Sequence, residues 1–453
     1  MRHSVLLTWL CVLTVLVVGN NRVSAEPTPI APITLGHSTA PLNGPWRFHV
    51  GDDPRWSSAD FDDSTWETVD LTPAPDAHDG DVGLPGYVSG WSRRGHAGYT
   101  GYAWYRLKVD IDSDTNTLLR LAGPTLVDST YELYVDGKLL GGSGIFAGTT
   151  PTVFGVRPTI FPLPSSVSAG TTTTYLVAFR VWMDPLDAGE DNGGIHVAPI
   201  VGDADGIDRL HQVQWLQTFK GYVVDAVEPL AFVLLALMVV GVIAYRTDDA
   251  YGWLVIALLL LALLRVHQVL FYWTDLVSLR SYDTTTTVIL RPLTLAAWIL
   301  AWTDWFRIGR SGWLRSVVIA GTAIYIVCAL LSRPWFLPEA TGGIKPIADG
   351  VIEGVRVAFV ALYLWIVVLG TIRCARPSTY LAVLAAVLVG IGLFATELNA
   401  LGIPGIWFPY GTGVARGQYA YAAFFVVLFV LLLIRSAGYA REERFPLRTS
   451  APQ

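Results

Sequence analysis

The stretch YGWLVIALLLLALLRVHQVLFYW, Tyr251–Trp273, is almost uninterrupted apolar sequence. A helix rises about 1.5 Å per residue, so a run of this length crosses the roughly 30 Å hydrocarbon layer of a membrane. Runs of this kind occur seven times, at Val223–Tyr245, Tyr251–Trp273, Thr287–Phe306, Trp313–Leu331, Val351–Ile372, Tyr380–Leu401 and Gln418–Leu433. A bilayer offers no water to unpaired backbone groups, so these runs are expected to be helices. Buried helices of a large soluble enzyme are the alternative, which seven runs in succession disfavour.

The composition also indicates an integral membrane protein. Only 15% of the 453 residues are charged, against about 25% in ordinary soluble chains, and 52% are hydrophobic. The three cysteines, Cys11, Cys328 and Cys374, lie in apolar or membrane-adjacent stretches. They offer neither a disulfide framework nor a CxxC metal site, so we expect no metal and no cofactor.

The amino terminus has the pattern of a secretory signal. Arg2 and His3 precede an apolar run, and Val23-Ser24-Ala25 supplies a small-x-small end. This pattern predicts a signal peptide over residues 1–25, cleaved after Ala25, with an uncleaved anchor as the alternative. Under both interpretations, the residues that follow are expected to be exported from the cytoplasm.

Residues 26–208 form a region of different character. They hold 24 of the 37 acidic residues and no long apolar run. Short alternating segments such as Trp46–Val50 and Tyr175–Trp182 are separated by turn signals, among them Asp191-Asn192-Gly193-Gly194. Asp136-Gly137 is the dipeptide that a type I′ hairpin turn favours. The region is therefore predicted to be an all-β sandwich outside the cytoplasm.

Three motifs in this region carry a resemblance. They are Asn43-Gly44-Pro45-Trp46-Arg47-Phe48, Phe61-Asp62-Asp63-Ser64-Thr65-Trp66 and Gly101-Tyr102-Ala103-Trp104-Tyr105-Arg106. In this order they resemble the galactose-binding-like jelly roll of β-galactosidase-type glycoside hydrolases, over about Pro41–Pro199. The catalytic barrel of those enzymes, with its paired carboxylates, has no counterpart here. The resemblance implies a jelly-roll fold with carbohydrate affinity, not hydrolysis.

A jelly roll followed by seven helices resembles the bacterial seven-transmembrane receptors with diverse intracellular signalling modules. That resemblance covers about Pro41–Tyr439 and implies a plasma-membrane receptor. It predicts four parts: residues 1–25, 26–208, 209–438 as the helical membrane domain, and 439–453 as a short cytoplasmic tail. The output domain of the family does not follow the seventh run, which predicts a separate cytoplasmic signalling protein as partner.

Arginine positions give the orientation. An exported first domain makes the first helix run inward, and the connections then alternate. The predicted inner connections carry Arg246, Arg307, Arg310, Arg315, Arg373, Arg376, Arg435, Arg441, Arg444 and Arg448, and the predicted outer ones carry Arg280, Arg333, Lys345 and Arg416. This excess follows the positive-inside rule, so the carboxyl terminus is predicted to be cytoplasmic.

Ionisable residues within the apolar runs are the first site candidates. They are Asp225, Glu228, Arg265, His267, Arg291, Glu353, Arg356 and Glu397, all in the predicted outer halves of their helices. A charge at the centre of an inserted helix costs about 2.5–3.5 kcal/mol, so these residues should pair or face water. We expect one polar cluster beneath the sandwich that binds a polar ligand or couples the sandwich to the helices. Interfacial salt bridges that only stabilise the bundle are the alternative.

A Gly-rich loop in the β region is the second candidate. Trp91, Arg94, His96 and Tyr102 could form a rim in which aromatic faces stack on sugar rings and basic groups reach hydroxyls. Trp46, Trp66, Trp104 and Trp182 are predicted to be core residues instead. Asp52-Asp53 and Asp62-Asp63 could hold calcium, although turn formation explains them as well. Trp298, Trp302, Trp305 and Trp313 are expected in an aromatic belt at the inner membrane face.

No nucleotide-binding, hydrolase or metalloprotease motif occurs, and no basic–aromatic pattern suggests nucleic acid. The sequence therefore predicts a non-enzymatic receptor whose partners are membrane lipids, a small polar ligand such as a carbohydrate, and a cytoplasmic protein. A transport protein that uses the polar cluster is the alternative. An intramembrane enzyme with Glu353 or Glu397 as acid or base is a third interpretation. The oligomeric state stays open.

Overall fold

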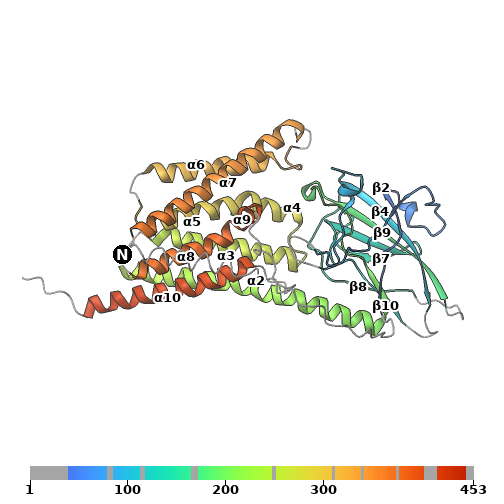
Figure 1. The fold of residues 1–453 in the computed structure, drawn as a ribbon, viewed down its shortest axis with the longest axis horizontal. Helices are drawn as coiled ribbons and strands as arrows, with labels where there is room; N and C mark the ends of the chain where they lie inside the picture. The colour runs from blue at the N-terminus through green and yellow to red at the C-terminus, as the bar shows by residue number, and fades with distance from the viewer. Residues whose placement is uncertain are drawn as a thin grey trace, which may run out of the picture. The chain divides into compact units, whose positions relative to one another are not determined.

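The computed structural model describes residues 39–78, 85–112, 118–164, 172–246, 251–308, 312–337, 341–373, 377–401 and 416–444 (Figure 1). The expected signal peptide and the last part of the expected tail, 445–453, lie outside the described residues. Strands fill the first half of the described chain and helices the second. A β region followed by an apolar helical region is the order that the sequence predicts.

The strands form two antiparallel sheets. They are β1 (Thr39–Pro41), β2 (Trp46–Val50), β3 (Glu67–Val69), β4 (Gly101–Asp112), β5 (Leu119–Ala122), β6 (Thr130–Val135), β7 (Lys138–Gly142), β8 (Ile160–Pro162), β9 (Thr172–Met183) and β10 (Ile200–Asp203). One sheet has the order β1-β10-β5-β8 and the other β3-β2-β4-β9-β6-β7. A shared core draws side chains from both sheets, so this region is a β-sandwich. The finer jelly-roll assignment stays a prediction.

Alternation along β9 shows why the sandwich forms. Val177, Phe179 and Val181 are every second residue and all lie in the main core. Ala178, on the other face, packs in a smaller cluster with Trp66 and Trp104. The four tryptophans predicted as core are all buried. The predicted hairpin turn also forms between β6 and β7, with φ of 50° at Asp136 and 80° at Gly137.

The carboxylate pairs considered for calcium have structural partners instead. Asp52 accepts hydrogen bonds from the Trp104 indole at 3.0 Å and from Arg180 Nε at 2.8 Å. Asp63 accepts from Nε of the fully buried Arg106 at 2.8 Å. Among the described residues, no three His, Cys, Asp or Glu side chains are grouped as a metal site would need.

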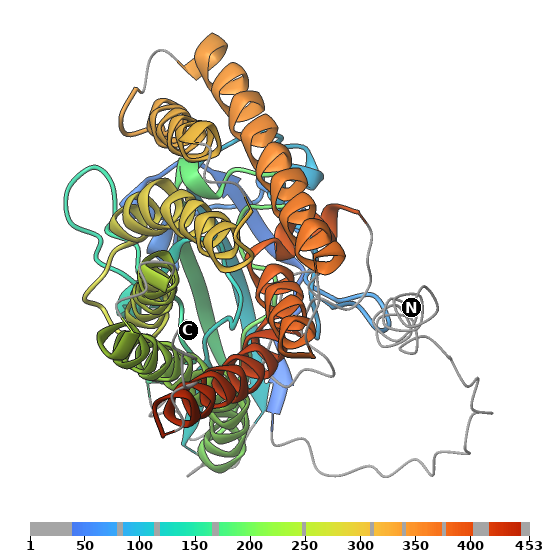
Figure 2. The same ribbon diagram turned by 90° about the vertical axis from the view of Figure 1, so that its left-hand side faces the viewer.

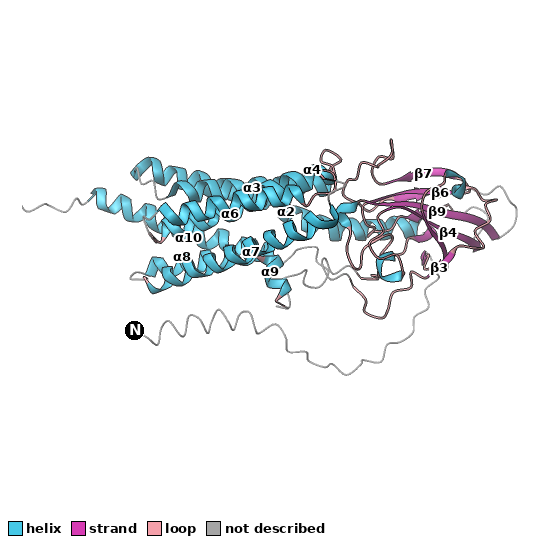
Figure 3. Ribbon diagram, turned by 90° about the horizontal axis from the view of Figure 1, so that it is seen from above, coloured by secondary structure: helices cyan, strands magenta, loops and turns pink. Residues whose placement is uncertain are grey.

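The helical region consists of α2 (Ala204–Arg246), α3 (Gly252–Trp273), α4 (Leu279–Tyr282), the π-helix η6 (Asp283–Leu290), α5 (Arg291–Trp305), α6 (Gly312–Leu331), α7 (Thr341–Ile372), α8 (Pro377–Leu393), α9 (Ala395–Ala400) and α10 (Arg416–Arg444). Figure 2 views most of these helices nearly end-on, and Figure 3 separates them by colour from the strands. Apart from single residues at their ends or at the α8–α9 break, the seven apolar runs lie within one or two of these helices each.

Six described helices are long and apolar enough to cross a membrane, where the sequence predicts seven. The spans are Val224–Ala244, Gly252–Trp273, Leu279–Trp305, Gly312–Leu331, Gly343–Ile372 and Gly417–Ala437. The sixth apolar run is different because the helix is interrupted at Phe394. The interruption divides the run into α8, of 17 residues, and the short α9. At about 1.5 Å per residue, α8 alone is at the lower limit for a crossing. The seventh crossing is therefore a proposal.

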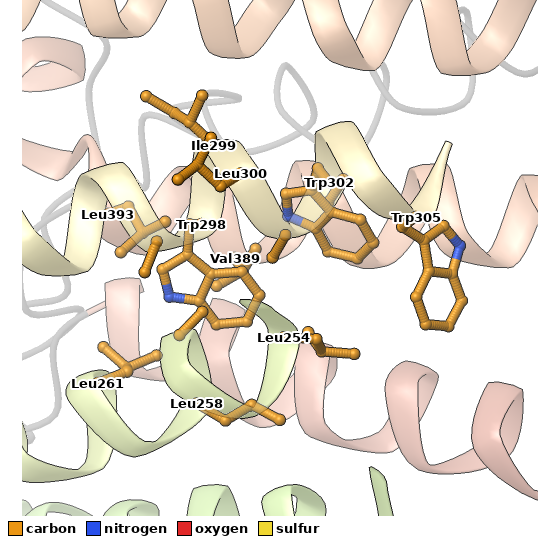
Figure 4. Close-up of a cluster of buried hydrophobic side chains, with 14 of the residues drawn as sticks. Leu254, Leu258, Leu261, Trp298, Ile299, Leu300, Trp302, Trp305, Val389 and Leu393 are labelled. Carbon is orange, nitrogen blue, oxygen red and sulfur yellow. The ribbon is translucent and has the colours of Figure 1, made fainter. Parts of the chain in front are cut away.

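Helix α5 lies at the centre of the helix packing. Twelve of its 15 residues are buried, and it contacts α3, α6 and α7. Figure 4 shows Trp298 and Trp302 among leucines of α3 and residues of α8. Both indoles have no exposed surface and Trp305 is 7% exposed, so these three do not form the expected aromatic belt. Trp313 on α6 is 57% exposed and fits that expectation.

Replacing Trp302 by Ala should therefore lower the stability of the helix bundle strongly. The substitution leaves a large cavity between packed helices, which costs about 3–5 kcal/mol in protein cores. Thermal unfolding of the detergent-purified protein measures the effect. Trp313→Ala is the matched control and should change the midpoint little. Equal midpoints for the two variants would contradict the central position of α5.

Candidate functional site

The sandwich passes into the first membrane helix without a linker. Strand β10 ends at Asp203 and α2 begins at Ala204, slightly before the expected boundary at residue 208. The Asp203 carboxylate accepts the Gly206 amide hydrogen at 2.6 Å, as a helix-capping residue does. The Ala204 amide donates to the Leu118 carbonyl at 2.8 Å, and Arg120, in β5, forms an ion pair with Asp208. The start of α2 is thus bonded to the sheet.

A second contact joins the sandwich to the connection between α3 and α4. Arg157 donates from Nη1 to the Trp273 carbonyl at 2.8 Å, and its Nη2 pairs with the Asp275 carboxylate. The Leu279 amide donates to the Val153 carbonyl at 2.8 Å. Gly155 permits this approach, since a Cβ there would lie 2.9 Å from the Phe271 carbonyl oxygen. Both ends of the α3–α4 connection are therefore held by the sandwich.

A third contact is ionic. The Asp184 carboxylate, at the end of β9, has a side chain only 3% exposed and lies 3.2 Å from Arg280 Nη2 of α4. The Asp184 amide donates to Ser129 Oγ at 2.8 Å, and that hydroxyl donates to the Asp187 carboxylate. Asp283, the first residue of η6, pairs with Arg333 at 2.6 Å. We call Asp184, Asp187, Arg280, Asp283 and Arg333 the junction charges.

The environment of Asp187 favours its protonated form. Burial raises the pKa of its carboxyl to about 7, against a hydrogen bond from Ser129 that lowers it, and the charges of Asp128, Asp184 and Asp283 raise it further. His196 lies nearby, 2.8 Å from the Asp128 carboxylate and 2.8 Å from the Val88 carbonyl. Burial opposes the charged imidazole, but the hydrogen bond and the charge of Asp128 outweigh it, so the pKa of His196 is raised.

These two groups should make the protein less stable as the pH rises. Each has a raised pKa in the fold, so its stabilising contribution is present below its ordinary pKa and is lost as the pH rises through its folded value, about 7 for Asp187. Asp187→Asn removes the ionisation and should flatten the decline between about pH 4 and about pH 7, by on the order of 1 kcal/mol per pH unit. Thermal unfolding midpoints across this range measure it.

Asp60→Asn, at an exposed carboxylate of the same sandwich, is the control and should keep the wild-type pH profile. An unchanged profile in Asp187→Asn would contradict the assigned environment of Asp187.

The Gly-rich loop forms less of a rim than the sequence suggests. Trp91 is 1% exposed within the main core, and its indole donates to the Tyr99 carbonyl at 3.1 Å, so its ring offers no face to a ligand. Arg94 donates to the Asp70 carbonyl at 3.0 Å, and His96 Nε2 lies 2.7 Å from Glu67 Oε1. Tyr102 lies elsewhere, in β4, with the Arg180 guanidinium 4.4 Å from its ring centre.

The first part of the expected intramembrane cluster does form. Arg265 of α3 pairs with Glu228 of α2 at 2.6 Å and lies 3.5 Å from Asp225. Asp225 also accepts a hydrogen bond from Gln418 of α10. Arg265 and Glu228 have side chains 11% and 7% exposed, and the Arg265 guanidinium lies 5.6 Å from the Tyr421 ring centre. We call these groups the Arg265 cluster; it ties α2, α3 and α10 together.

The other candidates form a separate set of bonds. Arg356 of α7 pairs with Glu397 of α9 at 2.5 Å, and Arg291 of α5 donates to the Thr396 hydroxyl at 2.8 Å. His267 Nδ1 lies 2.8 Å from the Thr286 hydroxyl of η6. Glu353 is exposed and has no ion pair with any described residue. The candidates expected in a single cluster therefore form two separate ion-paired groups, around Arg265 and Arg356, while Arg291 and His267 bond to threonine hydroxyls and Glu353 joins neither group.

The residues that the sequence analysis missed lie at the junction. Asp184, Arg157 and Asp275 lie in loops, and Asp187 ends the short 3-10 helix Pro185–Asp187, where a single sequence gives no sign of a partner. Arg280 was counted only for topology. Their one local signal is position, since Asp275 and Arg280 fall in and just after a short connection that the sequence predicts on the same side of the membrane as the β region.

Comparisons with known proteins find only weak likenesses. No protein-family model matches the chain, and no curated protein matches it. A β-glucuronidase 2 of Bacteroides uniformis, solved with a covalently bound cyclophellitol-6-carboxylate aziridine, is 19% identical with a TM-score of 0.26, over 36% of this chain and 18% of that chain. A β-glucuronidase of Ruminococcus gnavus is 13% identical with a TM-score of 0.23, over 38% of this chain and 29% of that chain. The chain thus spans less than a third of either enzyme, and we draw no conclusion about its function from these matches.

Arg265→Ala should strongly destabilise the helix bundle. Removing the one guanidinium leaves Asp225 and Glu228 without their cationic partner in a buried setting, which costs about 3–5 kcal/mol in comparable pairs. Thermal unfolding in detergent measures the loss. Glu353→Gln, at an unpaired acidic residue, is the control and should stay within about 0.5 kcal/mol of wild type. Equal stability of the two variants would show that the Arg265 cluster does not hold the helices.

Proposed function

We propose that this chain is a membrane-embedded sensor whose sandwich lies outside the cytoplasm and binds a small polar ligand, which includes carbohydrates. Ligand binding would change the conformation of the sandwich, and the helices would transmit this conformational change to a separate cytoplasmic protein. The observation that carries the proposal is the triple attachment of the sandwich to α2, to the α3–α4 connection and to α4. A movement of these attached segments of the sandwich would therefore act on the helices.

The attachment through Arg280 leads toward the centre of the bundle. Helix α4, the π-helix η6 and α5 follow one another without a break, so Arg280 lies on the same span as the buried Trp298 and Trp302. A π-helix of eight residues is unusual, and such segments occur often at functional sites. We propose that η6 changes its hydrogen bonding when the ligand acts on the junction, which would shift α5 among its neighbours.

The orientation of the proposed sensor follows from the arginines of the connections. Gln418 lies near the start of α10, whereas Arg435 lies in its second half, and the Arg435 guanidinium is 4.1 Å from the Trp305 ring centre. The positive-inside rule puts Arg435 on the cytoplasmic side of a bacterial plasma membrane, and the junction charges on the outer side. The cytoplasmic partner would then meet the ends of α2, α5 and α10.

Transport is the second candidate, favoured by the Arg265 cluster. Three ionisable side chains and an amide between α2, α3 and α10 are what a polar substrate path through the membrane would use. Their mutual pairing also suits a purely structural role. An enzymatic role has less support, because Glu397 is paired with Arg356 and Glu353 is exposed.

Breaking the junction tests the sensor. Arg280→Gln removes the ion pair with Asp184, and in full-length protein in nanodiscs it should speed hydrogen exchange in η6 and also at the far ends of α2 and α10. Arg55→Gln, at an ion pair on the sandwich surface with an 82% exposed arginine, is the matched control and should leave the helices unchanged. Faster exchange confined to the sandwich and α4 would contradict the sensor. Ion-gradient-driven uptake of sugars into proteoliposomes would favour transport instead.

A further inference from the structure

A cavity of about 240 Å³ lies at the junction between the sandwich and the helices. The sandwich contributes Ser143, at the end of β7, and Phe154, Arg157 and Thr159, which precede β8. Asp275 of the α3–α4 connection also lines the cavity, and the remaining lining residues are Ile145 and three glycines. The volume is a little below the range of about 300–1,000 Å³ typical of small-molecule sites, which suits a ligand of one ring.

The lining has the composition of a site for a neutral polar molecule. Its one cation, Arg157, is paired with its one anion, Asp275. An anionic ligand would have to displace Asp275 from Arg157, and a cationic ligand would have to displace Arg157. A neutral ligand can bond to both groups without breaking their pair.

Hydroxyl groups make use of this lining best. The Asp275 carboxylate is 62% exposed and can accept further hydrogen bonds, while the Ser143 hydroxyl can donate or accept. The Thr159 hydroxyl donates to the Arg157 carbonyl at 3.0 Å, which leaves its oxygen available as an acceptor. Phe154 is only 9% exposed, so it adds a small apolar contact to the lining.

We propose that this cavity is the ligand site and that it takes a neutral, polyhydroxylated molecule the size of one sugar ring. The inference rests on the proposed sensor function and gives it a place and a ligand class. It moves the site from the Arg94–His96 loop to the junction. Because Asp275 belongs to the α3–α4 connection, a ligand that bonds to Asp275 acts on a helix connection directly.

The test is calorimetric titration of the full-length protein in nanodiscs with neutral hexoses (glucose, galactose and mannose), with glucuronate and with glucosamine. A neutral hexose should bind, and it should bind more tightly than either charged analogue. Asp275→Asn removes the charged acceptor and should weaken binding about tenfold or more. Ser143→Leu should abolish binding by filling the cavity, and it leaves the Arg157–Asp275 pair in place.

Arg94→Gln is the matched control, since it alters the other candidate loop, and it should bind as wild type does. Tighter binding of glucuronate or glucosamine would overturn the ligand class. Binding lost in Arg94→Gln but kept in Asp275→Asn and Ser143→Leu would overturn the site and leave the sensor intact. Absence of binding by every hexose would overturn the inference, while the Arg280→Gln exchange experiment tests the sensor without a ligand.

Discussion

The absence of any linker between β10 and α2 is the constraint on which the rest of the structure depends. A strand that continues directly into a 43-residue helix, with Asp203 bonding to the first turn, fixes the first helix to the sheet. The other two attachments then restrict the sandwich further. Arg157 and Arg280 bind the α3–α4 connection to a sandwich that α2 already holds. With one attachment the sandwich could rotate about the start of α2. With three attachments it is held to α2, to the α3–α4 connection and to α4.

The lipid environment explains the pairing of charges in the helices. An ionised side chain in hydrocarbon is unfavourable by several kcal/mol, so Arg265 is acceptable only with Glu228 and Asp225 beside it, and Arg356 only with Glu397. Each ion pair joins two different helices, α2 with α3 and α7 with α9, and so helps to determine which helices pack side by side. Tight aromatic packing around Trp298 and Trp302 supplies the remaining cohesion, since lipid tails are as apolar as the helices and hydrophobic burial alone does not drive helix association.

The sequence predicts those parts of the fold that depend on local pattern. Apolar runs mark the helices, alternation marks β2 and β9, and Asp136-Gly137 marks a hairpin, because each pattern reflects the geometry of its own segment. Interactions between distant segments could not be predicted in this way. Trp91 and Trp298 look like surface aromatics in the sequence and are core residues, because only the tertiary fold decides which face of an element is covered.

The junction illustrates the same limit for the candidate site. Asp184 and Arg280 lie almost 100 positions apart, and no pattern along one chain indicates that they meet. The sixth apolar run is continuous in sequence, yet the helix is interrupted at Phe394. The positions of the charges within the apolar runs were readable from the sequence, whereas partner choice was not, which is why one expected cluster became two.

Distance measurement between spin labels tests most directly whether the sandwich is held to the helices. Labels at Lys138, exposed in β7, and at Ile372, exposed at the end of α7, report on the two regions of the full-length protein in nanodiscs. The account predicts one narrow distance distribution, because the sandwich is attached at three places. A broad distribution, as a freely swinging domain would give, would contradict it.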